Sequence, residues 1–501
     1  MSIKFNSKVG NIVAEKTEVI IFPFFEDHHE FTSEMGAIDK ATSGLIRHVL
    51  NSGDFKGEFN TLSMVYTQGK IPTPRILLVG LGKKDRFNLE IMREAGGKGL
   101  KYLRDIGIKR IAIPGELIEA NGFKKEDLIE AFLTGGSLGI YQFKDLITTE
   151  KDKIKNINEC VVVVKKKEEA KTIKNIITFT TIITQAVYLA RDLVSLPANK
   201  KTPTILANRA QAIAKRNRLR CKIINELQAR KLGMGAFLSV AQGSQEPAKI
   251  IILEYNAGSS YGPPLVIIGK GITFDSGGIS LKSPEKMEKM KNDMAGGAVV
   301  MGVVQAVAQM KLPVNLVGII PATENLPGGR AYKPGDVLTS LSGQTIEVVS
   351  TDAEGRLILA DALTYAHRFK PRAILDLATL TGACIIALGD HVAGIMGNDD
   401  SLIERVKVAS EKTGEKVWQL PLWEEYFEYL KSDIADFKNV GERAAGPITG
   451  GMFLSKFVKG IPWVHIDIAG PTWLEKERPY IPKGASGFGV RLLLQLLRDW
   501  N

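Results

Sequence analysis

Residues 264–278, PLVIIGKGITFDSGG, join a run of apolar, mostly β-branched residues to a glycine-rich segment that ends in polar residues. An apolar run without alternating polar residues is typical of a strand buried on both faces of a sheet. Helix-like segments follow around residues 296–310 and 357–369. Four similar apolar runs are KIIILEYN (249–256), VNLVGIIPA (314–322), RAILDLATL (372–380) and WVHIDIAG (463–470). The alternation of strand-like and helix-like segments predicts an α/β fold with a mixed sheet covered by helices.

The first third of the chain alternates in the same way. Strand-like and helix-like segments follow one another at 17–25, 41–53, 75–82, 89–107 and 108–115. The 501 residues exceed the roughly 250–300 residues at which single cores stop growing, so two domains are expected. We predict a smaller N-terminal α/β domain over residues 1–165 and a larger domain over 166–501. The apolar-periodic segment 172–195, followed by Pro197, predicts a linking helix.

The composition excludes several classes of protein. With 44% hydrophobic and 24% charged residues, the chain is neither disordered nor fibrous. The N-terminus lacks the layout of a secretory signal and no stretch resembles a membrane span, so we expect a cytoplasmic protein. The three cysteines form no CxxC pair, which argues against a disulfide framework or a thiolate zinc site.

The formal net charge of +11 leaves a DNA-binding regulator as an alternative function. Much of the excess lies in short lysine runs such as 165–167, which are usually solvated surface. Charge is therefore a weak argument for DNA binding.

Candidate site residues, the first four of them polar, follow the ends of four predicted strands. In open α/β sheets ligands bind outside the carboxyl ends of the strands, so we expect these residues at one crevice. They are Lys270, Asp352, Glu354, Thr379, Leu380, Ala469 and Gly470.

The segment 350–356, STDAEGR, carries two acids two residues apart. If its backbone is extended, Asp352, Glu354 and Arg356 project from the same face. Two carboxylates so placed repel each other unless a cation lies between them. Oxygen ligands without cysteine or HExxH suit Mg, Mn or Zn. The competing interpretation is a surface strand end followed by an acid at a helix N-terminus.

Residues 269–278 form a glycine-rich loop whose backbone can approach a ligand closely. A phosphate-binding loop is disfavoured because the spacing is not GxxxxGK[ST]. Asp293 precedes the small-residue run 295–298, where a helix could pack closely, and could be merely a helix-start acid.

The six histidines form no metal-spaced pair, and no GxSxG elbow occurs. A histidine-ligated zinc protease is therefore disfavoured. A dimetal phosphoesterase would also use clustered carboxylates and stays open as a third function.

Seven long motifs follow one another along the chain: LARDLVSLPAN (189–199), LGMGAFLSVAQGS (232–244), GKGITFDSGGISLK (269–282), KMKNDMAGGA (289–298), STDAEGRLILADAL (350–363), LATLTGA (377–383) and HIDIAG (465–470). They closely resemble the motifs of the leucyl aminopeptidase family, also called cytosol aminopeptidases. The resemblance covers about residues 185–490, whereas the first domain is similar only in its layout. STDAEGRL matches the family signature NTDAEGRL, with Ser350 in place of asparagine, a departure that bears only on the fine positioning of Asp352.

The resemblance implies a metallo-aminopeptidase that releases N-terminal leucine and similar residues from peptides. It further implies a two-metal site (Zn or Mn) in the C-terminal domain and a homohexamer. It assigns Lys270, Asp275, Asp293 and Glu354 to the tighter metal, and Asp275, Asp352 and Glu354, with the Asp352 carbonyl, to the more exchangeable one.

The resemblance also implies two catalytic residues, Lys282 and Arg356. Lys282 would stabilise the developing oxyanion, and Arg356 would hold a bicarbonate ion that carries the proton. The residues that match the lining of the family's substrate site are Met290, Thr379, Leu380 and Gly382.

Overall fold

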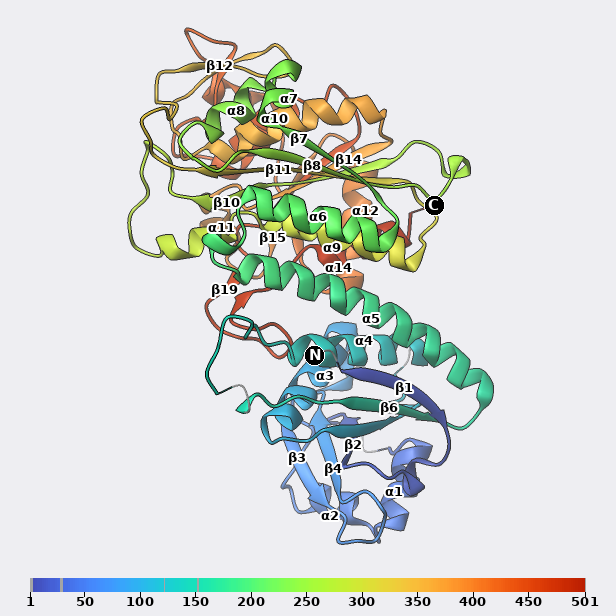
Figure 1. Cartoon of the computed structure of the whole chain (residues 1–501). Helices are drawn as coiled ribbons and strands as arrows, with labels where there is room; N and C mark the ends of the chain where they lie inside the picture. The colour runs from blue at the N-terminus through green and yellow to red at the C-terminus, as the bar shows by residue number, and fades with distance from the viewer. Residues whose placement is uncertain (1–2, 28–29, 121, 151–152, 501) are drawn as a thin grey trace. The chain divides into compact units, whose positions relative to one another are not determined.

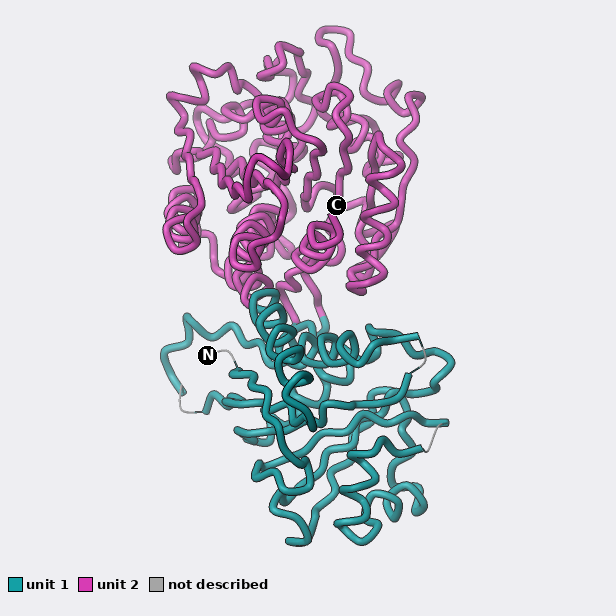
Figure 2. Tube along the Cα trace, turned by 90° about the vertical axis from the view of Figure 1, so that its right-hand side faces the viewer, with its two compact units in different colours: residues 1–184, 476–482 teal, residues 185–475, 483–501 magenta. Residues whose placement is uncertain are grey.

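The structure is a computed structural model that describes residues 3–27, 30–120, 122–150 and 153–500. The chain forms two compact units (Figure 2). Unit 1 comprises Met1–Thr184 and Lys476–Pro482, and unit 2 comprises Gln185–Glu475 and Lys483–Asn501. Helix α5 spans Lys167–Ser195, where the sequence predicted a linking helix, and each unit includes part of it.

Unit 1 is built on a six-stranded sheet in the order β1-β6-β5-β2-β4-β3. All pairs are parallel except β3 with β4. The strands are β1 Lys4–Val9, β2 Val19–Phe24, β3 Leu62–Tyr66, β4 Arg75–Gly80, β5 Arg110–Pro114 and β6 Glu159–Val164. The helices are α1 Ser33–Ala41, α2 Leu45–Asn51, α3 Leu89–Asp105, α4 Lys125–Gly139 and the first part of α5.

Apolar side chains cover both faces of this sheet, as expected for a sheet with helices on both sides. Ile21 of β2 lies in one core with residues of α3, α4 and α5. Its neighbours Ile20 and Phe22 lie in a second core with residues of α1 and α2. The N-terminal α/β architecture is therefore confirmed.

Unit 2 is built on a nine-stranded mixed sheet in the order β16-β15-β18-β14-β9-β11-β8-β7, with β10 paired to β11. The central strands β18, β14, β9 and β11 are parallel, whereas β8 and β15 run antiparallel to their neighbours β11 and β18. The strands are β7 Arg220–Asn225, β8 Lys249–Tyr255, β9 Leu265–Gly269, β10 Gly271–Asp275, β11 Leu316–Asn325, β14 Ala373–Ala378, β15 Ala393–Gly397, β16 Val417–Gln419 and β18 Trp463–Asp467.

Helices cover both faces of this sheet, with α8 and α10 on one face and α6 and α9 on the other (Figure 1). The helices of unit 2 beyond α5 are α6 Pro203–Asn217, α7 Glu226–Leu232, α8 Gly235–Ala241, α9 Ala295–Met310, α10 Glu354–Ala366, α11 Gly382–Leu388, α12 Asp400–Thr413, α13 Gly446–Ser455 and α14 Val490–Arg498. Two small sheets join β12 Val337–Thr339, β13 Thr345–Glu347 and β17 Phe437–Lys438, and β19 Trp473–Leu474 with β20 Gly484–Ala485.

Two helical stretches are long and apolar enough to cross a membrane, Lys167–Ser195 and Met287–Met310, although the sequence suggested no membrane span. In Met287–Met310, 78% of the most apolar window is buried inside the fold. Helix α5 contributes Ile173, Ile176 and Ile177 to the core of unit 1. Packing within the fold therefore accounts for most of the apolar window of Met287–Met310, and for part of that of Lys167–Ser195, of which 44% is buried.

Candidate metal centre

Three buried carboxylates meet at the carboxyl end of the central strands of unit 2. Asp275 ends β10, Glu354 begins α10, and Asp293 follows the short 3-10 helix Met287–Asn292. Oxygen atoms of the three carboxylates lie within 4.8 Å of one another. All three residues are buried, so their charges have little access to water. Burial of several like charges is costly unless cations compensate them.

Two lysine side chains supply positive charge to this cluster. Lys270, directly after β9, places Nζ 2.7 Å from Asp293 Oδ2 and 2.7 Å from Glu354 Oε1. Lys282 places Nζ 2.9 Å from Asp275 Oδ2 and also pairs with Asp352. With Asp352 there are four carboxylates, so the two ammonium groups neutralise only half of the carboxylate charge.

Burial and charge shift the pKa values of the cluster in a consistent way. Burial acts to lower the pKa of Lys270 and of Lys282, but the neighbouring carboxylates outweigh it and hold both pKa values above the ordinary lysine range. Burial and the neighbouring acids raise the pKa of Asp293 and of Glu354. The site therefore favours added positive charge.

Hydrogen bonds orient the carboxylates individually. Asp275 Oδ1 accepts from Asn325 Nδ2 at 2.8 Å and from the Gly277 N–H at 3.0 Å. Asp293 Oδ1 accepts from the Thr379 hydroxyl at 2.6 Å. Among the described residues, Glu354 Oε2 is buried without a hydrogen-bond partner. A buried, unpaired carboxylate oxygen needs an explanation, and a ligand such as a metal ion is one.

Glycines allow the chain to pass close to Lys270. A Cβ on Gly355 would lie 2.7 Å from Lys270 Nζ, and a Cβ on Gly296 would lie 2.1 Å from the Leu377 carbonyl oxygen. The Gly297 N–H donates to the Lys270 carbonyl at 2.8 Å. The start of helix α9 thus packs closely against the chain at Lys270 and Leu377, as the small-residue run predicted. This packing brings Asp293, just before the helix, beside Lys270.

The segment around Asp352 differs from the extended strand end considered from sequence. Strand β13 ends at Glu347 and α10 begins at Glu354, so Asp352 and Glu354 do not lie two apart on one strand. The Asp352 side chain is 38% exposed, whereas that of Glu354 is 2% exposed. The short turn between strand and helix separates the two acids into a solvent-facing and a buried position.

Thr351 ties the Asp352 turn to the glycine-rich loop. Its hydroxyl donates to the Gly277 carbonyl at 2.6 Å and accepts from the Ser280 N–H at 2.7 Å. Ser350, which replaces the asparagine of the signature, accepts from the Asp352 N–H through Oγ at 3.2 Å. The serine hydroxyl therefore retains a local side-chain-to-backbone bond that fixes the turn.

Arg356 lies in the first turn of α10 and is buried. Its Nη1 donates to the Asn439 carbonyl at 2.8 Å, and among the described residues its Nε has no hydrogen-bond partner. Burial lowers the pKa of Arg356 to about 10, so the guanidinium stays cationic at neutral pH. It is a buried cation with an N–H group available to an anion.

The four residues expected to line the substrate site lie on two segments. Met290 lies in Met287–Asn292, three residues before Asp293. Thr379 and Leu380 follow β14, and Gly382 begins α11, where a Cβ would meet no atom within 4 Å. Buried Asp467 fixes the second segment by accepting from the Leu380 N–H at 3.1 Å and the Thr381 hydroxyl at 2.7 Å. Thr379 joins the two segments through its bond to Asp293.

Ala469 and Gly470 were expected at the same crevice, but the contacts of both residues are with neighbouring parts of the chain. The Ala469 N–H donates to Asp467 Oδ1 at 3.1 Å, and a Cβ on Gly470 would lie 2.1 Å from the Gly389 carbonyl oxygen. His465 pairs with buried Asp376 at 2.6 Å. No histidine belongs to the metal-capable group found in the described chain.

Sequence reasoning missed two asparagines, Asn325 and Asn439. Asn325 ends β11, so the strand-end rule would have found it if the strand had been extended beyond Ala322. Asn439 follows the two-residue strand β17, which carries no sequence pattern of its own.

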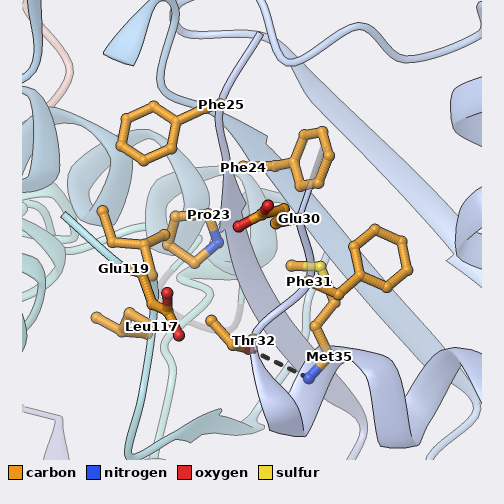
Figure 3. A pocket seen from close by; sticks show the side chains of 10 residues that line it. Pro23, Phe24, Phe25, Glu30, Phe31, Thr32, Met35, Leu117 and Glu119 are labelled. Atoms are coloured by element: carbon orange, nitrogen blue, oxygen red, sulfur yellow. Dashed lines mark hydrogen bonds between the residues drawn. The ribbon is translucent and has the colours of Figure 1, made fainter. Parts of the chain in front are cut away.

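Unit 1 has a separate small pocket of about 90 Å³ that opens beside the ends of β2 and α1 (Figure 3). Its wall includes the rings of Phe24 and Phe31, and Glu30 and Glu119 extend toward it. Ligand pockets are usually about 300–1,000 Å³. This pocket is too small for a peptide.

Comparison with known proteins gives concordant matches over both units. The catalytic-domain model of the cytosol aminopeptidase family matches residues 188–494, and its N-terminal-domain model matches residues 21–149. A probable cytosol aminopeptidase of Geobacter sulfurreducens is 47% identical over 94% of this chain and 95% of its own length. One of Geotalea uraniireducens is 47% identical over 92% of both.

Two solved structures have the same fold over nearly the whole chain. A mutant of tomato leucine aminopeptidase has a TM-score of 0.88 and 31% identity, covering 99% of this chain and 97% of its own. The bottromycin maturation enzyme BotP in complex with Mn has a TM-score of 0.84 and 29% identity, covering 96% and 99%.

Proposed function

Because the chain belongs to the cytosol aminopeptidase family, we propose that the cluster around Glu354 holds two divalent metal ions and is its active site. The chain is a metal-dependent aminopeptidase, which removes residues from the N-terminus of peptides. The observation that carries the site proposal is the group of three buried carboxylates with an unpaired Glu354 Oε2.

The donor set fits divalent metals. Carboxylate oxygens without cysteine or histidine suit Mn, and Zn also accepts such ligands. A lysine ligates only as the neutral amine, so metal binding at Lys270 would displace its proton. We propose Zn or Mn; the Mn complex of BotP supports Mn for that relative.

The two metal positions would share two carboxylates. Asp352 is assigned to the more exchangeable position because it alone of the four acids is exposed to solvent to a substantial degree. The tighter position would use Lys270, Asp275, Asp293 and Glu354, and the exchangeable one Asp275, Asp352 and Glu354 with the Asp352 carbonyl. Ions bound there would supply Lewis-acid polarisation of the scissile carbonyl and activation of a water.

Lys282 is proposed to act on the reacting carbonyl and not as a ligand. Its pKa is raised by Asp275, Glu354 and Asp352 against the opposing effect of burial, so it stays cationic. Its side chain is 24% exposed, whereas that of Lys270 is 3% exposed, which supports a role for Lys282 on the side open to substrate. A fixed cation there stabilises negative charge that develops on the oxygen.

Arg356 is proposed to hold a bicarbonate ion. Its buried cationic guanidinium and unpartnered Nε fit a small anion, which would supply a proton acceptor. Met290, Thr379, Leu380 and Gly382 are proposed to line the substrate site, because Thr379 connects their two segments to Asp293.

We also propose a homohexamer in the cytoplasm. Unit 2 exposes large apolar side chains that self-association would cover, among them Ile386 at 86%, Trp418 at 65% and Trp423 at 65%. The relatives named above are called cytosol aminopeptidases, which supports the location. A particle mass near six times 54.8 kDa in light scattering supports the hexamer, and a monomer mass refutes it.

The other functions lack comparable support. The DNA-binding alternative rests on the net charge of +11 alone, and the comparisons give it no support. The phosphoesterase alternative is at odds with the family. Leucine p-nitroanilide and p-nitrophenyl phosphate, assayed after chelation and after addition of Mn or Zn, test the proposal. Metal-restored cleavage of the anilide alone is expected. Full cleavage by the chelated, metal-free protein would overturn the metal proposal.

A further inference from the structure

Asn439 lies at the edge of the small sheet formed by β12, β13 and β17. It directly follows β17, is fully buried, and its N–H donates to the Glu347 carbonyl at 2.8 Å. Glu347 is the last residue of β13. Asn439 therefore stands where the chain leaves this sheet for the turn that carries Asp352.

The Asn439 side chain binds that turn with both of its polar atoms. Oδ1 accepts from the Val349 N–H at 2.8 Å and from the Ser350 N–H at 3.4 Å. Nδ2 donates to the Ser350 carbonyl at 2.6 Å and to the Ala353 carbonyl at 3.5 Å. A carboxamide has two acceptor sites and two donors, so these four bonds use its full capacity.

The Asn439 backbone holds a second residue of the proposed site. Its carbonyl accepts from Arg356 Nη1 at 2.8 Å. One buried residue thus touches both ends of the stretch between Val349 and Arg356, within which Asp352 and Glu354 lie.

We propose that Asn439 is a positioning residue that sets the geometry of Asp352, and so the affinity of the more exchangeable metal position. This rests on the proposed function, because it presumes that Asp352 is a ligand. Partners that orient metal ligands typically change metal affinity or activity by about 10–100-fold when replaced. A residue that only stabilised the loop would lower the melting temperature and leave metal affinity unchanged.

Asn315 offers a matched control with the same bonding pattern. Its Oδ1 accepts from the N–H groups of Ala257 and Gly258 at 2.8 and 3.3 Å, and its Nδ2 donates to the carbonyls of Gly258 and Gly262 at 2.9 and 2.8 Å. It precedes β11, at the amino end of the strands whose carboxyl ends carry the site. Its replacement disturbs a clamped loop without reaching the cluster.

The experiment compares Asn439→Ala and Asn315→Ala with the wild type by metal titration of the metal-free full chain with Mn, together with melting temperature and leucinamide kinetics. Asn439→Ala is expected to weaken the second of the two metal-binding events about 10–100-fold and to leave the first near wild type. Asn315→Ala is expected to lower the melting temperature and keep both binding events. Equal metal affinities in Asn439→Ala and the wild type would overturn the proposal.

Asn439→Asp serves if the alanine variant does not fold. The aspartate keeps the acceptor for the Val349 and Ser350 N–H groups, but it turns an oxygen instead of an N–H donor toward the Ser350 carbonyl. We therefore expect the same weakening of the second metal-binding event, and unchanged metal binding would overturn the proposal. The wild type separates this test from that of the function. If wild-type protein binds no metal or cleaves no leucinamide, the proposed function fails. If it does both and the Asn439 variants match it, only the present inference fails.

Discussion

Replacement of Lys282 by methionine should abolish most turnover without loss of metal. The ammonium lies 2.9 Å from Asp275 Oδ2 and also pairs with Asp352. Methionine keeps most of the apolar stem and removes only the charge. Since Lys282 is assigned to the reacting carbonyl and not to coordination, activity and metal binding should respond differently.

The size of each effect follows from these contacts. Loss of one donor that stabilises a developing oxyanion typically costs about 10²–10³ in kcat, or roughly 2.7–4 kcal/mol. In the metal-free protein Lys282 competes with a metal for two of the four carboxylates. Its removal therefore leaves metal affinity equal or higher, because binding no longer has to break these ion pairs.

The assay combines steady-state cleavage of leucine p-nitroanilide with metal counting by mass spectrometry. Lys456→Met is the matched control, because Lys456 pairs with Glu424 at 3.0 Å and its side chain is 23% exposed, against 24% for Lys282. The control should keep wild-type kcat. If the metal content of Lys282→Met falls in parallel with its activity, Lys282 is a ligand and the reasoning is wrong.

Three further predictions concern ligands, packing and substrate. Asp293→Ala should lose one of two metals per chain by mass spectrometry, because Asp293 belongs to only one proposed position; two retained metals with normal activity would remove it from the site. Gly355→Ala should weaken binding of the tighter metal about 10–100-fold, because the new Cβ would lie 2.7 Å from Lys270 Nζ. Gly329→Ala, whose Cβ would meet no atom within 4 Å, should give the same metal titration as the wild type. N-acetyl-leucinamide should resist cleavage. The rate of leucinamide cleavage should rise with pH as the substrate amine loses its proton, with a pKa of about 7.7–8.0. Equal rates for both substrates from pH 6 to 10 would indicate an amidase.

The strands that support the site were predictable because their residues are buried on both faces. The runs at 264–269 and 372–378 lack polar alternation, and they form the parallel strands β9 and β14. Asp275 and Asp293 were assigned to the site through the resemblance of their motifs, which are local stretches of sequence, whereas Asp352 and Glu354 were also proposed from their place after a predicted strand.

The features that were missed depend on contacts between distant residues. Asn439 meets Ser350 across 89 positions of the chain, and β17 is only two residues long. Residues 476–482 belong to unit 1, far from the rest of that unit in sequence. The composition of residues 476–482 does not indicate that this segment belongs to unit 1. The sequence predicted this helix from about residue 357, and an acid at a helix N-terminus was only the competing interpretation; the helix begins at Glu354, where the preceding Ala353 makes no side-chain cap bond.

The most direct test of the account is calorimetric titration of the metal-free chain with Mn or Zn, with leucinamide hydrolysis measured at each step. The account predicts two ions per chain and full activity only when the second position fills. Saturation at one ion per chain with full activity, or full activity before any metal is added, would contradict it.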